Sequence, residues 1–117
     1  MDILFEILFL DEAFDYLKNL EPKHYEKILY NIRKTQTNQD SELFKKLKDE
    51  IWEFRTLYMG LQHRMLAFWD KSDSKNTLVV ATHGFIKKTS KVPEIEIKKA
   101  KQLRIKYFED KVISIGK

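Results

Sequence analysis

The chain has no cysteine, three histidines and no long hydrophobic run. Without cysteine it forms neither a disulfide nor a thiolate metal site or nucleophile, which suits a reducing compartment. The three scattered histidines also argue against a structural metal site. The apolar run at residues 3–10 is shorter than the roughly 20 residues that span a bilayer, and it lacks the cleavage site of a signal peptide. We therefore expect a soluble, cytoplasmic protein that requires no metal or cofactor.

Several sequence motifs of enzymes are also absent. The chain has no Walker loop, no Gly-x-Ser-x-Gly elbow, no Cys/His ligand spacing and no paired-carboxylate spacing. Metal-dependent hydrolysis is therefore disfavoured. Internal repeats, low-complexity segments and linkers are absent too, and 117 residues with 43% hydrophobic content fit a single domain over residues 1–117.

The charge is distributed unevenly along the chain, although the net charge is a modest +4. Residues 1–20 carry five acidic residues and one basic residue, whereas residues 83–117 carry ten basic and four acidic residues. A basic C-terminal third points to phosphate, and hence nucleic acid, as a partner. A solvated, lysine-rich surface of no special function explains the same excess equally well.

Hydrophobic periodicity predicts an α+β fold in the order β-α-α-β-β-β-α. A largely buried strand is expected at residues 3–10, and Asp11 is expected to cap a helix at 11–20. A second helix should begin at Pro22 and end near Lys34, with a loop at 35–41 after it. Residues Leu43, Phe44 and Leu47 are expected to anchor the connection back to the core. Strands at 50–57, 62–69 and 77–86 should form an antiparallel meander, and a closing helix should follow Pro93.

The N-terminal strand is expected to join this meander at an edge or in the centre. The result would be an antiparallel-rich sheet of about four strands with helices packed on it. In the closing helix, one face towards the core should carry Ile97, Ala100, Leu103, Arg104 and Tyr107.

Charged residues interrupt the apolar pattern of the first two meander strands. Because alternate residues of a strand share a face, Glu53 and Arg55 should lie on a polar face, opposite a core face with Trp52 and Phe54. Arg64 heads a row that is otherwise largely apolar. It is therefore expected either to pair with a carboxylate, Glu53 being available, or to bind a phosphate.

Four cations recur on consecutive predicted strands: Arg55, Arg64, Lys87 and Lys88. Short hairpins should bring at least some of them into one groove. A cationic groove at a sheet edge is suited to a nucleic-acid backbone.

His83 lies four residues before Lys87 on the same predicted strand. A histidine there can act as general acid or base in breaking a phosphodiester. The alternative is a buried, hydrogen-bonded histidine, which is common for this residue type. His63 and His24 carry weaker signals.

Three separated motifs of the chain resemble a known family. They are Leu47-Lys-Asp-Glu-Ile-Trp-Glu-Phe-Arg55, Arg64-Met-Leu-Ala-Phe, and His83-Gly-Phe-Ile-Lys-Lys-Thr-Ser-Lys-Val-Pro93 followed by Glu94-Ile-Glu-Ile-Lys-Lys-Ala100. In type and spacing they resemble the phage-derived, HigB-type branch of the RelE/ParE toxin superfamily. The resemblance covers essentially the whole chain.

The resemblance implies the toxin of a type II toxin–antitoxin pair. Such a toxin is a small endoribonuclease that cleaves messenger RNA on the ribosome until a cognate helix-turn-helix antitoxin neutralises it. Catalysis would need no metal, because the RNA 2′-hydroxyl attacks its own phosphate, leaving a 2′,3′-cyclic phosphate and a 5′-hydroxyl. ParE-like gyrase inhibitors share the fold, so gyrase inhibition is one alternative function and non-catalytic RNA binding is another.

The resemblance also assigns roles to residues. Phosphate binding and transition-state stabilisation are implied for Arg55, Arg64, Lys87 and Lys88, and RNA binding extends to Thr89, Lys91, Lys98 and Lys99. The sequence departs from the RelE pattern at Glu53, where a lysine is usual, and Tyr107 does not match its C-terminal tyrosine. The general acid and base are left open among His83, Lys87 and Glu53.

Overall fold

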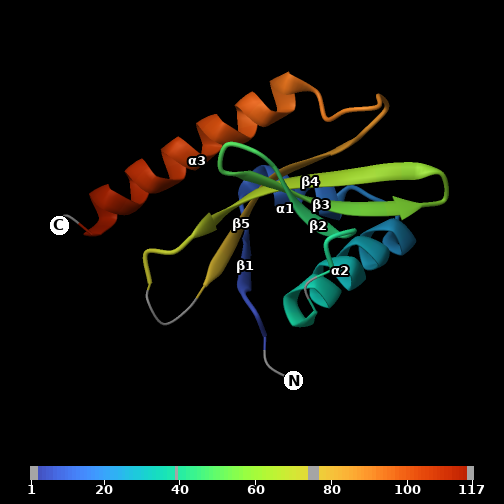
Figure 1. Cartoon of the computed structure of the whole chain (residues 1–117), viewed down its shortest axis with the longest axis horizontal. Helices are drawn as coiled ribbons and strands as arrows, with labels where there is room; N and C mark the ends of the chain where they lie inside the picture. Colours follow the sequence, from blue (N-terminus) through green and yellow to red (C-terminus); the bar gives the residue numbers. More distant parts are fainter. Residues whose placement is uncertain (1–2, 39, 74–76, 116–117) are drawn as a thin grey trace.

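The computed structural model describes residues 3–38, 40–73 and 77–115 and has an α+β fold with a five-stranded mixed sheet and three helices (Figure 1). The strands are β1 (Glu6–Phe9), β2 (Phe44–Lys48), β3 (Ile51–Tyr58), β4 (Leu61–Asp70) and β5 (Leu78–Ile86). The helices are α1 (Asp11–Lys18), α2 (Pro22–Thr37) and α3 (Glu94–Ile115). Within the described residues, no helix combines the length and apolar character needed to cross a bilayer.

The sheet has the strand order β1-β5-β4-β3-β2. The predicted meander is confirmed, because β3, β4 and β5 are consecutive antiparallel neighbours. Met59 and Gly60 join β3 to β4 with φ angles of 49° and 79°. Positive φ at both central residues is what a two-residue type I′ turn requires, and this turn matches the twist of the strands that it connects.

The prediction missed strand β2. Residues 35–41 were expected to be a loop, but α2 continues to Thr37, and Phe44 begins an edge strand rather than a simple anchor. Phe44 is buried opposite Phe54, and the register shifts between Lys46 and Lys48. Such a short, lysine-rich strand has no regular alternation by which to recognise it. The predicted antiparallel-rich sheet of about four strands is therefore matched only roughly, because the sheet has five strands and the pair of β1 with β5 is parallel.

Strand β1 is shorter and more exposed than predicted. It spans Glu6–Phe9, with exposed and half-buried residues in alternation, because it lies at the edge of the sheet. It pairs with β5 in parallel. Asp11 is the first residue of α1 rather than its cap, and the capping residue Leu10 offers no side-chain hydrogen bond. Asp11 still lies in the first turn, where the helix dipole favours a negative charge.

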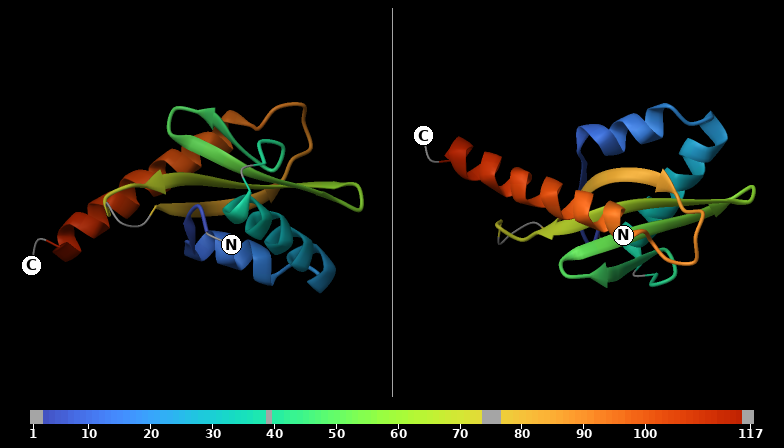
Figure 2. Two further views of the ribbon diagram at one scale, coloured as in Figure 1. Left: turned by 60° about the horizontal axis from the view of Figure 1, so that its bottom comes forward. Right: turned by 90° about the horizontal axis from the view of Figure 1, so that it is seen from above.

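Helices cover both faces of the sheet (Figure 2). On one face α1 and α2 pack over a core that includes Phe54, as predicted. On the other face, the row that Arg64 heads is largely apolar, as predicted, and the polar character predicted at Glu53 and Arg55 is confined to one end. There α3 packs over Leu66 and Phe68, and its buried side chains Ile97 and Ala100 confirm the predicted helix stripe. Burying a side chain such as Leu66 contributes roughly 1.5–3 kcal/mol, so both faces stabilise the fold.

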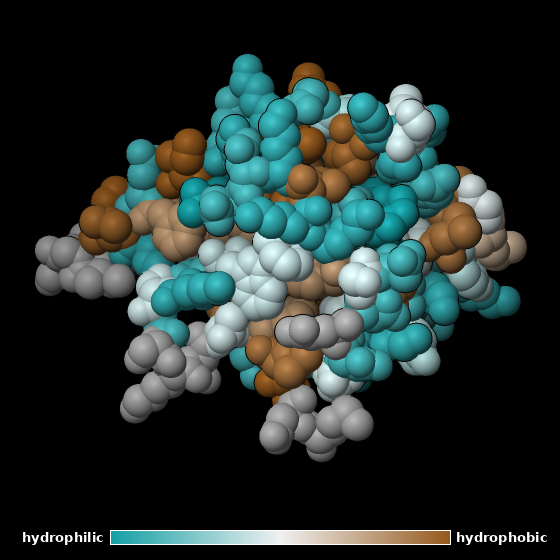
Figure 3. All heavy atoms as spheres, in the orientation of Figure 1, coloured by the Kyte–Doolittle hydropathy of each residue, from teal (hydrophilic) through white to brown (hydrophobic). Residues whose placement is uncertain are grey.

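Helix α3 extends beyond the sheet, and hydrophobic side chains are exposed along it (Figures 1 and 3). Ile105, Val112 and Ile113 are 55%, 68% and 63% exposed. The part of α3 nearest the sheet therefore supports the core, whereas its distal apolar side chains are left open to solvent.

A close contact fixes α1 on the sheet. Gly84 lies on β5 opposite Met65, and a Cβ atom at this position would overlap the ring of Tyr16 on α1. The absence of a side chain at Gly84 is therefore what lets the Tyr16 ring lie flat against the strand.

We predict that Gly84→Ala lowers the free energy of unfolding by roughly 1–3 kcal/mol, because the added methyl group overpacks this contact. Urea denaturation measures the loss. In a Tyr16→Ala background the same substitution should cost little, since the clashing ring is gone. Equal losses in both backgrounds would show that the contact with Tyr16 is not the cause.

Candidate functional site

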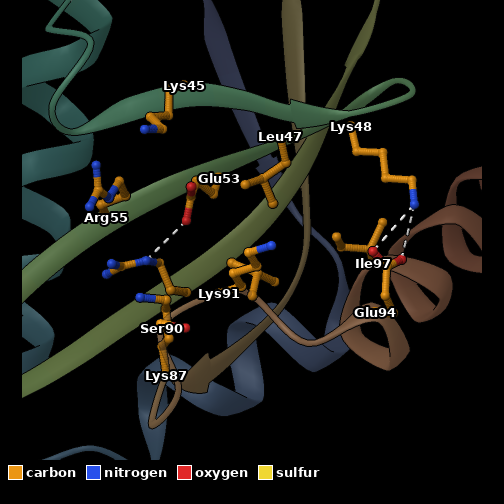
Figure 4. Close-up of a pocket in the computed structure, with 12 residues that line it drawn as sticks. Lys45, Leu47, Lys48, Glu53, Arg55, Lys87, Ser90, Lys91, Glu94 and Ile97 are labelled. Atoms are coloured by element: carbon orange, nitrogen blue, oxygen red, sulfur yellow. Dashed lines mark hydrogen bonds and ion pairs between the residues drawn. The ribbon is translucent and has the colours of Figure 1, made fainter.

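A cavity of about 340 Å³ opens on the face of the sheet that carries α3, next to the first turn of that helix (Figure 4). Strands β2, β3 and β4, the segment after β5 and the start of α3 contribute to its wall. Six basic side chains line it, namely Lys45, Lys48, Arg55, Arg64, Lys87 and Lys91. Two acidic side chains, Glu53 and Glu94, also line it, so the wall carries an excess of positive charge.

Strand register brings the central residues of the cavity together. Glu53 on β3 lies opposite Lys45 on β2, and Arg55 lies directly opposite Arg64 on β4. Like charges directly opposite each other in a sheet repel. Glu53, two residues before Arg55 on the same face, supplies the negative charge that offsets this repulsion.

Glu53 and Arg64 form a buried ion pair. The Arg64 Nε lies 2.9 Å from Glu53 Oε1, and the two side chains are 4% and 5% exposed. The sequence left open whether Arg64 pairs with a carboxylate or binds a phosphate, and the structure shows that it pairs with the carboxylate of Glu53. Burial lowers the pKa of Arg64, Glu53 opposes this effect, and the nearby charge of Arg55 adds to it.

Two further contacts fix the Arg64 guanidinium. Nη1 donates to the carbonyl oxygen of His63 at 3.1 Å, and Nη2 donates to Gln62 Oε1 at 3.1 Å. A guanidinium has five N–H donors, so donors are left over after these contacts and the ion pair. Arg64 is therefore both fixed in place and able to bind an anion in the cavity.

Gln62 links Arg64 to Lys87. Its Oε1 also accepts a hydrogen bond from Lys87 Nζ at 3.4 Å, and its carbonyl oxygen accepts one from the Lys87 backbone N–H at 2.8 Å. Lys87 follows the last residue of β5, so the main-chain bond to β4 holds it beside the arginine. The ammonium group and the guanidinium thus share one acceptor.

Four of the six cations have no counter-charge in the described part of the chain. Lys45, Arg55, Lys87 and Lys91 are not within ion-pair distance of any described carboxylate, whereas Lys48 binds Glu94 at 3.2 Å. These four side chains lie around Glu53 in Figure 4. A concave site with several unpaired cations is suited to phosphate groups.

The structure separates Lys88 and Thr89 from these residues. Both are exposed and lie outside the cavity lining. The Thr89 hydroxyl donates to the carbonyl oxygen of Lys91 at 2.6 Å, so it shapes the segment that carries Lys91. Lys91 itself lines the cavity.

The lysines of α3 lie elsewhere too. Lys98 is exposed and lines two other hollows along α3, and Lys99 lies 2.5 Å from Glu12 of α1 in an ion pair. Lys45 and Lys48, in contrast, line the cavity and were missed. They were missed because their strand, β2, was not predicted. Only the lysine-rich composition of this segment could have pointed to them.

His83 does not line the cavity. It is buried under α3, where its Nε2 donates to Glu96 Oε1 at 3.0 Å and its Nδ1 lies 3.0 Å from Thr82 Oγ1. Burial lowers the pKa of His83, and Glu96 opposes that shift. The geometry matches the alternative of a packed, hydrogen-bonded histidine.

His63 belongs to a hydrogen-bonded network that the sequence did not reveal. Its Nδ1 lies 2.6 Å from the Tyr16 hydroxyl, and its Nε2 lies 3.0 Å from Nδ1 of His24. Burial raises the pKa of Tyr16 to about 12, so the hydroxyl keeps its proton and donates to His63. Burial and the neighbouring His24 lower the pKa of His63. The network ties α1 and α2 to β4, directly behind Arg64.

Among the described residues, no cluster of three or more His, Cys, Asp or Glu side chains is arranged to hold a metal ion.

We predict that stability falls as the pH is lowered through about 6.5. The pKa values of His63 and His83 are below their ordinary value in the folded state, so the unfolded chain takes up protons that the folded chain excludes. Urea midpoints at pH values above and below 6.5 measure this loss. His63→Gln and His83→Gln should each flatten the pH dependence, and an unchanged slope in both variants would contradict the assignment.

We also predict that Glu53→Leu destabilises the fold by roughly 3–5 kcal/mol, because it leaves a buried guanidinium without its counter-charge. Combining it with Arg64→Met should restore much of the loss, since neither charge is then buried. Thermal or urea denaturation of both single variants and the double variant measures the coupling. Additive losses would mean that the ion pair is not the source of the cost.

Comparison with known families identifies the chain. Residues 15–104 match the family described as "Phage derived protein Gp49-like (DUF891)". The match extends from within α1 to within α3 and includes every residue that lines the cavity. No curated protein matches the chain. The matched family is related to the RelE and HigB toxins. The chain therefore belongs to the Gp49-like family of phage-derived proteins.

Proposed function

We propose that the protein is the toxin of a type II toxin–antitoxin system and acts as a metal-independent endoribonuclease on messenger RNA, in the cytoplasm and on the ribosome. The observation that carries this proposal is the group of cations without carboxylate partners around the buried Arg64. Family membership supports the toxin assignment. We further propose that the neutralising antitoxin carries a helix-turn-helix domain.

Arg64 and Lys87 are proposed to bind the scissile phosphate. Both line the cavity and share the acceptor Gln62. As the RNA 2′-hydroxyl attacks phosphorus, negative charge builds up on the phosphate oxygens. Fixed donors stabilise that charge without reorganising during the reaction. Arg55, Lys45 and Lys91 hold the neighbouring phosphates.

Two protons must move in this reaction. The 2′-hydroxyl gives up one as its oxygen bonds to phosphorus, and the 5′-oxygen gains one as its bond to phosphorus breaks, which leaves a 2′,3′-cyclic phosphate and a 5′-hydroxyl. We assign the base to Glu53, because it contacts Arg64, the proposed ligand of the scissile phosphate, whereas Glu94 lies at the start of α3 and contacts Lys48. The Lys87 ammonium supplies the proton for the leaving group. His83 is left out because it lies away from the cavity.

We predict that Lys87→Ala reduces messenger RNA cleavage by about 10²–10³-fold, the usual effect of removing one transition-state donor. Arg55→Ala should reduce cleavage by a smaller factor, because Arg55 holds a neighbouring phosphate. Neither residue has a described ion-pair partner, so both variants should remain folded. Sequencing of messenger RNA 5′ ends after expression in cells measures the cleavage. Lys106→Ala, on the exposed surface of α3, is the matched control and should cleave normally.

Two outcomes would contradict the proposal. Growth arrest with intact messages and a DNA-damage response would favour a gyrase inhibitor of the ParE kind. Cleavage that persists in both cavity variants would mean that the RNA binds elsewhere on the protein.

A further inference from the structure

A second hollow lies on the opposite face of the same sheet edge. It has a volume of about 260 Å³ and is lined mainly by aromatic side chains. They are Phe5, Phe44, Trp52 and Trp69. Phe44 and Lys45 are consecutive on β2, and Trp52 and Glu53 are consecutive on β3. Because successive residues of a strand point to opposite faces, the hollow and the cationic cavity lie back to back across the β2–β3 edge.

The aromatic rings pack against one another in T-shaped and tilted pairs and leave part of their surface open. The Trp52 and Trp69 rings are T-shaped with centroids 5.6 Å apart, and Phe44 lies 4.9 Å from Trp52. Phe44 is buried, but both tryptophans are half-buried. The hollow therefore offers aromatic surface that the described part of the chain does not cover.

Lysines join the two sites over the edge strand. Lys45 lines the cationic cavity, whereas the next residue, Lys46, pairs with Trp52 in the register and lies on the face of the hollow. Lys46 is exposed, and Lys71 lies with its Nζ 5.6 Å from the centre of the Trp69 ring. Positive charge thus continues from the cavity across β2 to the rim of the hollow.

We infer that the aromatic hollow binds a nucleobase of the same RNA whose phosphates occupy the cationic cavity. This inference rests on the proposed function. The RNA backbone crosses β2 along Lys45 and Lys46, and a base next to the crossing enters the hollow and contacts Trp52 and Trp69. Aromatic side chains next to a basic track are the usual means of binding single-stranded nucleic acid.

One acidic residue favours bases that carry an amino group. Asp40 lines the hollow, and its Oδ1 accepts the backbone N–H of Glu42 at 2.9 Å. A carboxylate has acceptor positions beyond that single bond. An exocyclic amino group, as in adenine, cytosine or guanine, is a suitable donor to it, whereas uracil has no such group.

Tryptophan fluorescence tests this inference on the unaltered protein, because both tryptophans of the chain line the hollow. The probe is a mixed-sequence 2′-O-methyl oligoribonucleotide, which cannot react by 2′-hydroxyl attack, with a label at its 5′ end. The label's anisotropy reports total binding, and tryptophan emission reports occupancy of the hollow. A fully abasic oligonucleotide of equal length is the control.

We expect the intact oligonucleotide to quench tryptophan emission with the same midpoint as the anisotropy change. The abasic control should bind about tenfold more weakly and should not quench. Two results would overturn the inference and leave the proposed function intact. One is binding that Arg55→Ala weakens but that leaves tryptophan emission unchanged, and the other is equal quenching by the abasic probe. Absence of any binding by the intact oligonucleotide would count against both.

A pair of lysine variants tests the path over β2. Lys46→Ala should weaken binding and reduce the slope of log affinity against log salt by about one, because one phosphate contact is lost. Lys23→Ala, exposed on α2, is the matched control and should change neither quantity. If Lys46→Ala binds with unaltered affinity and salt slope, the RNA does not cross β2. If a peptide from the antitoxin quenches tryptophan emission and the oligonucleotide does not, the hollow binds the antitoxin instead.

Discussion

The buried ion pair between Glu53 and Arg64 is the interaction on which the cavity depends. A guanidinium at 4% exposure is stable only with a counter-charge and hydrogen-bond acceptors, and these come from Glu53, from Gln62 and from the carbonyl oxygen of His63. Each contact also constrains a neighbouring element. Glu53 fixes β3 against β4, and Gln62 holds Lys87 at the end of β5. The buried charge of Arg64 is thus satisfied by polar side chains of β3 and β4, and one of these, Gln62, also holds Lys87 after β5.

The alternation of β4 connects this site to the other face of the sheet. Arg64 points to the α3 face, whereas its neighbour His63 points to α1 and α2 and contacts Tyr16 and His24. Tyr16 can reach His63 because Gly84 leaves room for its ring. The carbonyl oxygen that accepts from Arg64 thus belongs to a residue whose side chain is fixed by two helices. The rigidity of the cationic site therefore derives partly from packing on the opposite face of the sheet, which α1 and α2 cover.

Much of this arrangement could be predicted from the sequence, and the exceptions have physical causes. Period-2 patterns placed Arg55 and Arg64 on one face of neighbouring strands, because a strand alternates strictly. Strand β2 was missed because its lysines interrupt the alternation of apolar and polar residues by which a strand is recognised. As an edge strand, it also pairs with β3 alone. Lys88 was expected in the site, yet β5 ends at Ile86 and the side chain lies outside the cavity lining. The Tyr16–His63 contact joins residues 47 positions apart, and no local pattern reports such a packing event.

The cationic cavity also carries a cost to stability that explains its position. Arg55 and Arg64 face each other across two strands, and Lys45, Lys87 and Lys91 add charges that no described carboxylate offsets. Such repulsion destabilises the compact state. The surrounding sheet is heavily buried on both faces, with Ile51, Leu66 and Phe68 almost fully buried beneath α3. A well-packed core on each side lets the fold tolerate local repulsion at one edge, as is common where binding sites conflict with stability. A bound anion would lower the repulsion that Glu53 leaves among these cations, and this would add to its binding energy.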